Sequence, residues 1–318
     1  MPGRPGNAFV ILNASSGWDK KDAAPALVRA VLRTHGIECT VTKVTAGADI
    51  RAIASRAVAE GAELVVAGGG DGTLRAVAAG LSGTGVPMAV LPVGTLNHFA
   101  RDMEIPFDLE QAATVAAAGT AVTVDVGEVN GRVFINNSVI GLYPTYRFER
   151  ARREARGWNG KLAILGGIYS VFRRFPFLEV RLDAGDVTVA RRSPYIVIAN
   201  NEHAMEGFKP WQRDRMTDGM LWVYISRARS RFDLLRLVFK VLTGRLRTED
   251  EFEVLRAGRV RVAPHRRRIG VSLDGEVVSM ETPLEYRSRP RELRVMVPPG
   301  SRRVEEFVCE TGGVPSAP

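Results

Sequence analysis

The residues best suited to chemistry form one glycine-rich stretch, Gly68-Gly69-Gly70-Asp71-Gly72-Thr73. The apolar run before it, Leu64 to Ala67, predicts a buried strand, and residues 73–81 predict a helix. Glycines let the backbone turn sharply and bring bare N–H groups close to a ligand. The first turn of a helix adds unpaired N–H donors and a positive dipole end. The stretch therefore predicts a cradle for phosphate; a tight turn without a ligand is the alternative.

The stretch differs from two familiar phosphate-binding loops. A P-loop, G-x-x-x-x-G-K-[ST], needs a lysine that this loop lacks. A dinucleotide fingerprint, G-x-G-x-x-G, needs a third glycine where Thr73 stands. Asp71 also argues against capture of a simple anion, because a carboxylate repels phosphate unless a cation lies between them. Asp71 therefore indicates a magnesium nucleotide, in which the metal or its waters link the carboxylate to phosphate.

Strands and helices alternate along the first third of the chain. We expect strands over 8–13, 38–44, 64–67 and 86–91, and helices over 24–34, 50–59 and 73–81. This order predicts a parallel sheet that is covered on both faces. Ligands bind such sheets at the carboxyl ends of the strands. The glycine-rich stretch and Gly94-Thr95 both follow strands and can reach one crevice. The loop at 13–17 can face a nucleotide with its backbone amides, or it is an ordinary turn.

After an expected helix at 109–118 the chain becomes rich in short β runs. They are expected over 122–129, 132–139, 178–183, 186–190, 195–199, 220–225, 252–256, 258–263, 269–273 and 276–286. Helical segments near 145–174 and 230–243 interrupt them. Asn130-Gly131 is a strong hairpin signal between the first two runs. Repeated short strands of this kind predict a β-sandwich or barrel.

Several segments together resemble a known family. The sequence GGGDGTL at 68–74, followed by PVGTLN at 92–97, is similar to the catalytic-domain signature of the diacylglycerol and sphingosine kinase family, whose soluble bacterial members are lipid kinases. Weaker matches follow in the family's order: residues 13–17, Asp125-Val126-Gly127, Asp218-Gly219 and Asp274-Gly275-Glu276. The resemblance implies ATP-dependent transfer of the γ-phosphate, with Mg²⁺, to the hydroxyl of a lipid such as diacylglycerol or a sphingoid base.

The resemblance and the sequence patterns lead to one expected architecture. We expect an α/β protein with an N-terminal Rossmann-like parallel-sheet nucleotide domain over residues 1–120. A C-terminal β-sandwich domain over 121–303 would offer the lipid acceptor. The resemblance also implies that the tail, 304–318, packs back on the first domain.

The expected nucleotide-binding residues come from the loops described above. They are Asn13, Ser16, Gly17, Thr42, Gly68, Gly69, Gly70, Asp71, Gly72, Thr73, Gly94, Thr95 and Asn97. Thr42 enters through the resemblance, because the family has a threonine about there that touches the nucleotide; Thr45 competes with it.

Phosphoryl transfer also needs charge neutralisation and a base for the incoming hydroxyl. Asp71 is expected to act on the metal, and Asp125 is a second candidate; a turn-capping role is the alternative for Asp125. For the base, the resemblance favours Glu276 first and Asp274 second, whereas without it Asp274-Gly275 is a hairpin turn. The resemblance further implies a structural magnesium, held by Asp218 with the carbonyl groups of Arg215 and Met220.

Two positions depart from the family pattern. His98 stands where the family usually has an aspartate that can join the metal–water network. A neutral imidazole cannot replace an anion, and a protonated one repels magnesium. Asp102, one helical turn later, is a candidate substitute. Phe208 stands where a second glycine is common after Gly207, which affects the acceptor pocket.

The composition favours anionic partners. The 318 residues carry a formal charge of +9, which suits nucleotides, nucleic acid or an acidic membrane surface. Residues 147–156 and 227–247 could form basic amphipathic helices that rest on anionic lipid, or plain solvated helix faces. The two cysteines cannot form a disulfide framework. We see no signal peptide, and the longest apolar stretch, 162–172, is too short to span a bilayer.

We therefore expect a cytoplasmic protein that contacts the membrane peripherally and binds no nucleic acid; a homodimer stays open. Two other functions remain alternatives. One is an NAD kinase-like phosphotransferase, which shares the GGDGT loop, although residues 92–101 favour the lipid kinases. The other is a non-catalytic lipid- or nucleotide-binding module, which His98 motivates.

Overall fold

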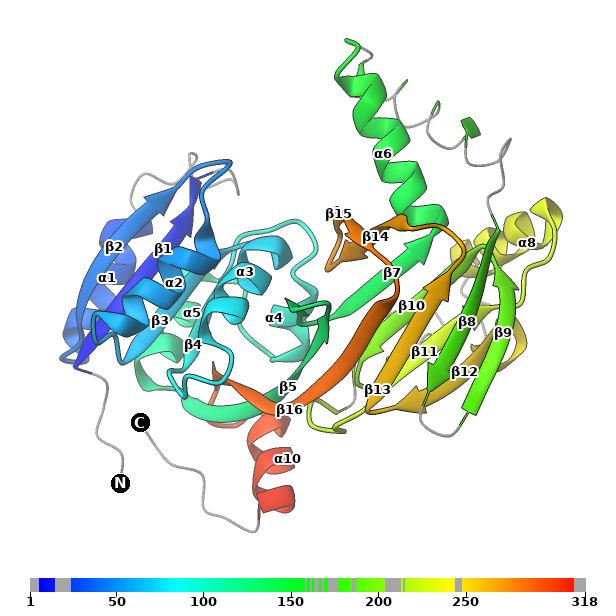
Figure 1. Cartoon of the computed structure of the whole chain (residues 1–318). Helices are drawn as coiled ribbons and strands as arrows, with labels where there is room; N and C mark the ends of the chain where they lie inside the picture. Colours follow the sequence, from blue (N-terminus) through cyan, green and yellow to red (C-terminus); the bar gives the residue numbers. More distant parts are fainter. Residues whose placement is uncertain are drawn as a thin grey trace. The chain divides into compact units, whose positions relative to one another are not determined.

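The computed structural model describes most of the chain (Figure 1). The described residues are 6–14, 24–157, 159, 160, 162, 166, 169, 170, 177–184, 187–203, 213, 215–243 and 248–311. Several predictions made from the sequence lie outside these residues: the nucleotide-binding roles of Ser16 and Gly17, the effect of Phe208, and the part of the tail beyond residue 311.

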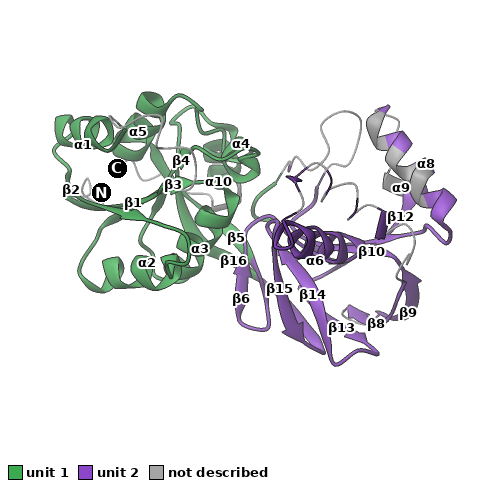
Figure 2. Ribbon diagram, turned by 90° about the horizontal axis from the view of Figure 1, so that it is seen from above, with its two compact units in different colours: residues 1–126, 215–218, 289–318 green, residues 127–214, 219–288 purple. Residues whose placement is uncertain are grey.

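The chain divides into two compact units, coloured separately in Figure 2. The first unit takes residues 1–126, 215–218 and 289–318, and the second takes 127–214 and 219–288. Two long strands, β5 (Thr120–Val129) and β16 (Leu284–Val297), contribute residues to both units.

The first unit is built on a parallel sheet with the strand order β2-β1-β3-β4. These strands and the helices of the unit are β1 (Asn7–Asn13), α1 (Ala24–Thr34), β2 (Glu38–Val44), α2 (Ile50–Ala59), β3 (Leu64–Gly69), α3 (Asp71–Leu81), β4 (Met88–Pro92), α4 (His98–Asp102), α5 (Leu109–Ala118) and α10 (Arg302–Thr311). Strands β3 and β4 are buried along their whole length, as expected for a parallel sheet covered on both faces. The strand order reverses between β1 and β3, which creates the topological switch point where such sheets bind ligands.

Local sequence accounts for where several helices begin. Asp49 caps α2 by accepting the Ala52 N–H at 3.0 Å, and Asp108 caps α5 by accepting the Gln111 N–H at 3.0 Å. Side chains of this kind satisfy donors that a helix cannot pair internally. The helices expected over 24–34 and 50–59 are confirmed, whereas the helix expected from 73 begins at Asp71 and the strand expected from 86 begins at Met88.

The second unit contains two sheets that face each other across a hydrophobic core. One has the order β12-β11-β10-β7-β14-β15 among the described residues, and the other joins β16, β13, β8 and β9. The elements are β6 (Arg132–Phe134), β7 (Asn137–Gly141), α6 (Leu142–Glu154), β8 (Leu178–Ala184), β9 (Val187–Ser193), β10 (Tyr195–Asn200), β11 (Leu221–Ser226), α8 (Arg231–Leu242), α9 (Thr248–Glu251), β12 (Phe252–Ala257), β13 (Arg259–Pro264), β14 (Arg268–Leu273) and β15 (Glu276–Glu281).

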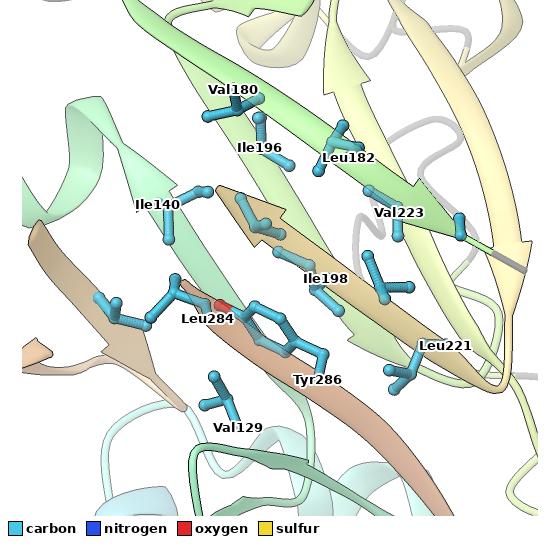
Figure 3. Packing of buried hydrophobic residues seen from close by; sticks show 14 of the residues in the cluster. Val129, Ile140, Val180, Leu182, Ile196, Ile198, Leu221, Val223, Leu284 and Tyr286 are labelled. Atoms are coloured by element: carbon cyan, nitrogen blue, oxygen red, sulfur yellow. The ribbon is translucent and has the colours of Figure 1, made fainter. Parts of the chain in front are cut away.

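Alternate residues of these strands form the core shown in Figure 3. Its buried side chains come in pairs two positions apart, as the period of a β-strand requires. They include Val180 and Leu182 of β8, Ile196 and Ile198 of β10, Leu221 and Val223 of β11, and Leu284 and Tyr286 of β16. Inner faces that meet in this way define a β-sandwich. The expected fold class, a parallel α/β sheet followed by a β-sandwich, is confirmed.

One strand prediction in this unit is wrong. The run expected over 132–139 is split into β6 and β7. The backbone N–H groups of residues 135–137 at the break donate to the carboxylate of Asp274. A side chain distant in the sequence thus interrupts a continuous β pattern. Similarly, the run expected over 276–286 is divided between β15 and the start of β16.

None of the helices within the described residues combines the length and the hydropathy that a span across a bilayer needs.

Candidate functional site

The carboxyl ends of β1 and β3 bring two predicted nucleotide-binding residues together. Asn13 is the last residue of β1, and Thr73 lies in the first turn of α3. The Asn13 side-chain amide donates to Thr73 Oγ1 at 2.9 Å. The two residues therefore meet at the switch point of the sheet, where a ligand is expected.

The glycines let the two predicted loops approach each other closely. A Cβ on Gly94 would lie 2.4 Å from the Cα of Gly70, so the loop after β4 touches the loop after β3 backbone to backbone. A Cβ on Gly69 would lie 2.4 Å from the Cβ of Thr73, which packs over it. Close packing between the two loops is therefore enough to explain why positions 69 and 94 require glycine, with no ligand involved.

The start of α3 has the features of an anion site. Its N-cap is Gly70, which has no side chain to cap the first turn. Among the described residues, no atom would lie within 4 Å of a Cβ on Gly72. An uncapped first turn presents N–H donors and the positive end of the helix dipole. These residues fit the phosphates of a nucleotide.

Asp71 connects the two loops. Its Oδ2 accepts the backbone N–H of His98 at 3.3 Å, and its Oδ1 accepts that of Phe99 at 3.2 Å. The carboxylate therefore holds the beginning of α4 as well as standing at the beginning of α3. A carboxylate keeps further lone pairs when it accepts two hydrogen bonds, so these contacts leave room for a water of a bound magnesium.

Asn97 closes the loop after β4. It has the left-handed conformation, with φ of 49°. Its Oδ1 accepts the Gly94 N–H at 2.9 Å, and its Nδ2 donates to the Gly94 carbonyl at 2.7 Å. Its buried side chain therefore shapes the turn, whereas Thr95 in the same turn is exposed. Thr42 is half-buried in β2, opposite Ile11 of β1.

Asp102, the candidate substitute for the aspartate missing at His98, faces the C-terminal helix. It is buried, and its carbonyl accepts Arg303 Nε at 2.7 Å. Burial lowers the pKa of the Arg303 guanidinium, while the charges of Glu306 and Asp102 act in the opposite direction. Asp102 thus compensates the buried charge of the Arg303 guanidinium. This is a structural role, whereas the sequence suggested Asp102 as a candidate for the metal–water network.

Asp125 and the segment 215–218 lie together in the first unit. Asp125 is buried; its backbone N–H donates to the Met216 carbonyl at 2.9 Å, and its Oδ1 accepts the Arg291 N–H at 2.8 Å. Glu306 accepts from the Met216 N–H and the Thr217 hydroxyl. Asp125 thus fastens this segment, which carries Asp218.

The structure offers few carboxylates for a metal. Within the described ranges, no group of three or more His, Cys, Asp or Glu side chains is placed to hold an ion. The structural magnesium suggested at Asp218, Arg215 and Met220 would therefore depend on backbone carbonyls. The Met220 carbonyl accepts the Asn201 N–H at 3.1 Å. Mg²⁺ in phosphoryl transfer commonly uses one or two carboxylates, waters and the phosphates themselves, which this chain can supply at Asp71.

The two candidate bases in the second unit have different surroundings. Asp274 lies in the β14–β15 turn with φ of 47°, and its carboxylate accepts three backbone N–H groups, those of residues 135, 136 and 137, at 2.8–3.0 Å. Glu276 is the first residue of β15 and is exposed. The geometry therefore gives the Asp274 carboxylate a structural role, whereas the side chain of Glu276 lies at the surface.

A buried polar cluster lies next to this turn, and it was not expected from the sequence. Arg213, which is fully buried, donates to the Ile135 carbonyl at 2.6 Å and to Asn136 Oδ1 at 2.8 Å. Asn200 donates its backbone N–H to the Asn136 carbonyl and its side-chain amide to the Ile135 carbonyl. The only signal in the sequence is an Asn-Asn dipeptide at each of two strand ends, at 136–137 and at 200–201.

Comparison with known proteins matches this architecture. Residues 7–129 match the diacylglycerol kinase catalytic domain, and residues 148–297 match the YegS C-terminal NAD kinase beta sandwich-like domain. A probable lipid kinase YegS-like protein of Pseudomonas aeruginosa is 32% identical over 292 residues, which cover 90% of this chain and 94% of the relative. A diacylglycerol kinase of Bacillus subtilis is 28% identical, with 92% and 96% covered.

Solved structures agree on the fold. A putative diacylglycerol kinase from Bacillus anthracis superimposes with a TM-score of 0.72 at 19% identity, and the match covers 93% of this chain and 99% of that one. The family expected from the glycine-rich stretch is thus confirmed. The chain belongs to the lipid kinase family that includes diacylglycerol kinase and the YegS-like proteins, and it is a kinase.

Proposed function

We propose that the protein transfers the γ-phosphate of ATP to the hydroxyl of a neutral lipid. The observation that carries this proposal is the start of α3, an uncapped helix N-terminus at the switch point of a parallel sheet, next to the Asn13–Thr73 contact. Helix N-termini at this place bind phosphate groups. Relatives named diacylglycerol kinase and probable lipid kinase support the choice of a lipid as acceptor.

Each part of the site has a task in the transfer. The N–H groups at residues 70–72 would hold the phosphates, since that of Thr73 already donates to the Gly70 carbonyl. Asp71 would hold a magnesium ion through its waters. The ion, when bound, neutralises the charge of the transferring phosphate. Glu276 accepts the proton of the lipid hydroxyl as that oxygen attacks. Asp125 keeps its positioning role in the first unit, and the metal at Asp218 stays a prediction.

The proposal includes contact with an anionic membrane surface through α8. Phe232 is 79% exposed and Phe239 is 61% exposed. They are seven positions apart, so they lie on one side of the helix, with the exposed Arg236 between them. Exposed aromatic rings with basic neighbours are typical of helices that lie in the membrane interface. A kinase with such a helix can work on a lipid from the cytoplasmic side of the membrane.

The test is incubation of the protein with labelled ATP, Mg²⁺ and mixed micelles of dioctanoylglycerol. We expect a labelled phospholipid, and we expect Asp71→Asn and Glu276→Gln each to reduce kcat by at least about 100-fold. Full activity in both variants would refute the proposed roles.

Two other outcomes of this experiment would select a different function. Because residues 148–297 match a sandwich domain named after NAD kinase, NAD is included as a second acceptor. Phosphorylation of NAD in the absence of lipid would favour a nucleotide kinase. Nucleotide binding without transfer to either acceptor would favour a non-catalytic module, as His98 suggests.

A further inference from the structure

The short helix α4 is held at both of its ends by residues of the first unit. At its beginning, the Asp71 carboxylate accepts the backbone N–H groups of His98 and Phe99. At its end, the Asp102 carbonyl accepts Arg303 Nε of α10, a helix of the same unit (Figure 2), at 2.7 Å. The helix α4 has only five residues, and helices this short are unstable in isolation. Contacts at its two ends therefore decide where it lies, and a shift of its end reaches the Asp71 carboxylate at its beginning.

A second contact of Arg303 leads to another part of the chain. Arg303 is 2% exposed, and its Nη1 donates to Glu306 Oε2 at 2.8 Å. Glu306 Oε1 accepts the Met216 N–H at 2.7 Å and the Thr217 hydroxyl at 3.0 Å. One guanidinium thus connects the end of α4, through Glu306, to the segment 215–218.

This segment depends on side-chain contacts for its place in the first unit. The chain on either side of it, 127–214 and 219–288, belongs to the second unit. Met216 is held from both sides, because its N–H donates to Glu306 and its carbonyl accepts the Asp125 N–H at 2.9 Å. Glu306 therefore fastens the segment that carries Asp218 to the same helix that holds α4.

We propose that Arg303 and Glu306 are positioning residues for the nucleotide site, because together they fix the Asp71 carboxylate, through α4, relative to the segment 215–218. This inference rests on the proposed function. A buried guanidinium that loses its partner is strongly destabilising, so Arg303 stays against Glu306. A guanidinium is also a planar fork that serves two acceptors in a fixed geometry, which makes the connection rigid.

The effect of this connection should fall on magnesium and not on the nucleotide itself. The backbone N–H groups that would hold the phosphates belong to α3 and the turn before it, not to α4. Mg²⁺ demands nearly ideal octahedral geometry, so a displaced Asp71 carboxylate would no longer meet the waters of the ion correctly. Groups that orient a metal site indirectly typically change metal affinity about 10- to 100-fold when they are lost.

The test replaces Arg303 by lysine, which keeps the positive charge but offers one ammonium group in place of the fork. Binding of AMP-PNP, an ATP analogue that is not hydrolysed, is measured by calorimetry in EDTA and again in Mg²⁺. The ratio of the Kd in EDTA to the Kd in Mg²⁺ reports the contribution of the metal. We expect Arg303→Lys to reduce this ratio about tenfold and to leave the Kd in EDTA unchanged. Glu306→Gln, which keeps the size of the side chain and removes its charge, should also reduce the ratio.

Arg289→Lys is the matched control. Arg289 and Glu292 form another arginine–glutamate pair three positions apart in the first unit, with Nη2 and Oε1 separated by 2.8 Å. Glu292 also accepts the Ser82 hydroxyl at the end of α3, which is the end opposite to Asp71. We expect a melting temperature close to that of Arg303→Lys and a ratio equal to that of the wild type.

A double variant tests whether Arg303 acts through Asp71. Residues that act as one unit do not show multiplied losses when both are replaced. The kcat of Asp71→Asn with Arg303→Lys, measured with dioctanoylglycerol, should therefore equal that of Asp71→Asn alone. A kcat reduced by the product of the two single losses would mean that Arg303 acts elsewhere.

Two further results would overturn the inference. An unchanged ratio in both Arg303→Lys and Glu306→Gln would mean that the connection supports only the fold. An equal fall of the ratio in Arg289→Lys would mean that any loss of stability weakens the metal site.

The binding measurement also separates this inference from the kinase proposal. If Mg²⁺ tightens AMP-PNP binding to the wild type but no phosphate reaches dioctanoylglycerol, the proposed reaction fails, and a reduced ratio in Arg303→Lys still supports the positioning role. If Mg²⁺ does not tighten binding to the wild type, the role of Asp71 toward magnesium is refuted, and the positioning role is refuted with it.

Discussion

Substitution of Gly94 by alanine tests the contact on which the nucleotide site depends. The new Cβ would lie 2.4 Å from the Gly70 Cα and 2.7 Å from Asn97 Oδ1. Ordinary van der Waals contacts begin near 3.4 Å, so the two loops must move apart by at least about 1 Å. Overpacking of this kind costs about 1–3 kcal/mol of unfolding free energy. A shift of about 1 Å at a catalytic centre costs about 100-fold in rate.

We therefore expect Gly94→Ala to lower the urea midpoint and to reduce kcat/KM for ATP about 100-fold. Gly300→Ala is the control in the same unit, because a Cβ there would meet no atom of the described part of the chain within 4 Å. It should match the wild type in both measurements. If Gly94→Ala has wild-type stability and wild-type kinetics, the loops after β3 and β4 do not touch as described, and the account of the phosphate site is wrong.

Three further predictions concern other parts of the chain. Asp274→Asn places an NH₂ group against backbone donors and should lower the unfolding free energy by about 1–3 kcal/mol, measured in urea; lost activity at full stability would instead make Asp274 the base. Phe232→Ala with Phe239→Ala should weaken sedimentation with anionic vesicles, most clearly at high salt, and leave turnover of dioctanoylglycerol in detergent unchanged; undiminished sedimentation would exclude α8. The hydrogen bond from Arg191 lowers the pKa of Glu253 below its ordinary value of 4.5. The pair therefore stabilises the fold fully above pH 4.5, and this stabilisation is lost as the pH falls through the lowered pKa. Arg191→Gln should flatten this part of the curve of unfolding free energy against pH, and an unchanged curve would contradict the pairing.

The parts of the structure that depend on neighbouring residues could be predicted from the sequence. Residues 64–81 contain a buried strand, the turn and the following helix within one short window, so periodicity and glycine content identify them. The same is true of the alternating core residues of β8, β10 and β11, which lead to the sandwich.

The parts that depend on distant residues could not be predicted. The carboxylate of Asp274 breaks a β pattern that lies 137–139 positions earlier in the chain, and no local propensity records such a contact. Asp71 was expected to serve a metal, but its hydrogen bonds to the start of α4 depend on how two loops meet in space. Asn200 is an ordinary strand-end residue until its burial is known.

The way the two units share the chain has a consequence for biosynthesis. The first unit includes residues 289–318, and Val295 of β16 pairs with Met88 on the outer side of β4. The first unit can therefore be completed only after residues 289–318 have been synthesised. An isolated fragment ending at Val126 would expose the unpaired edge of β4, and exposed edges of this kind invite aggregation. Any attempt to produce the amino-terminal part of this unit alone should graft residues 289–318 back onto it.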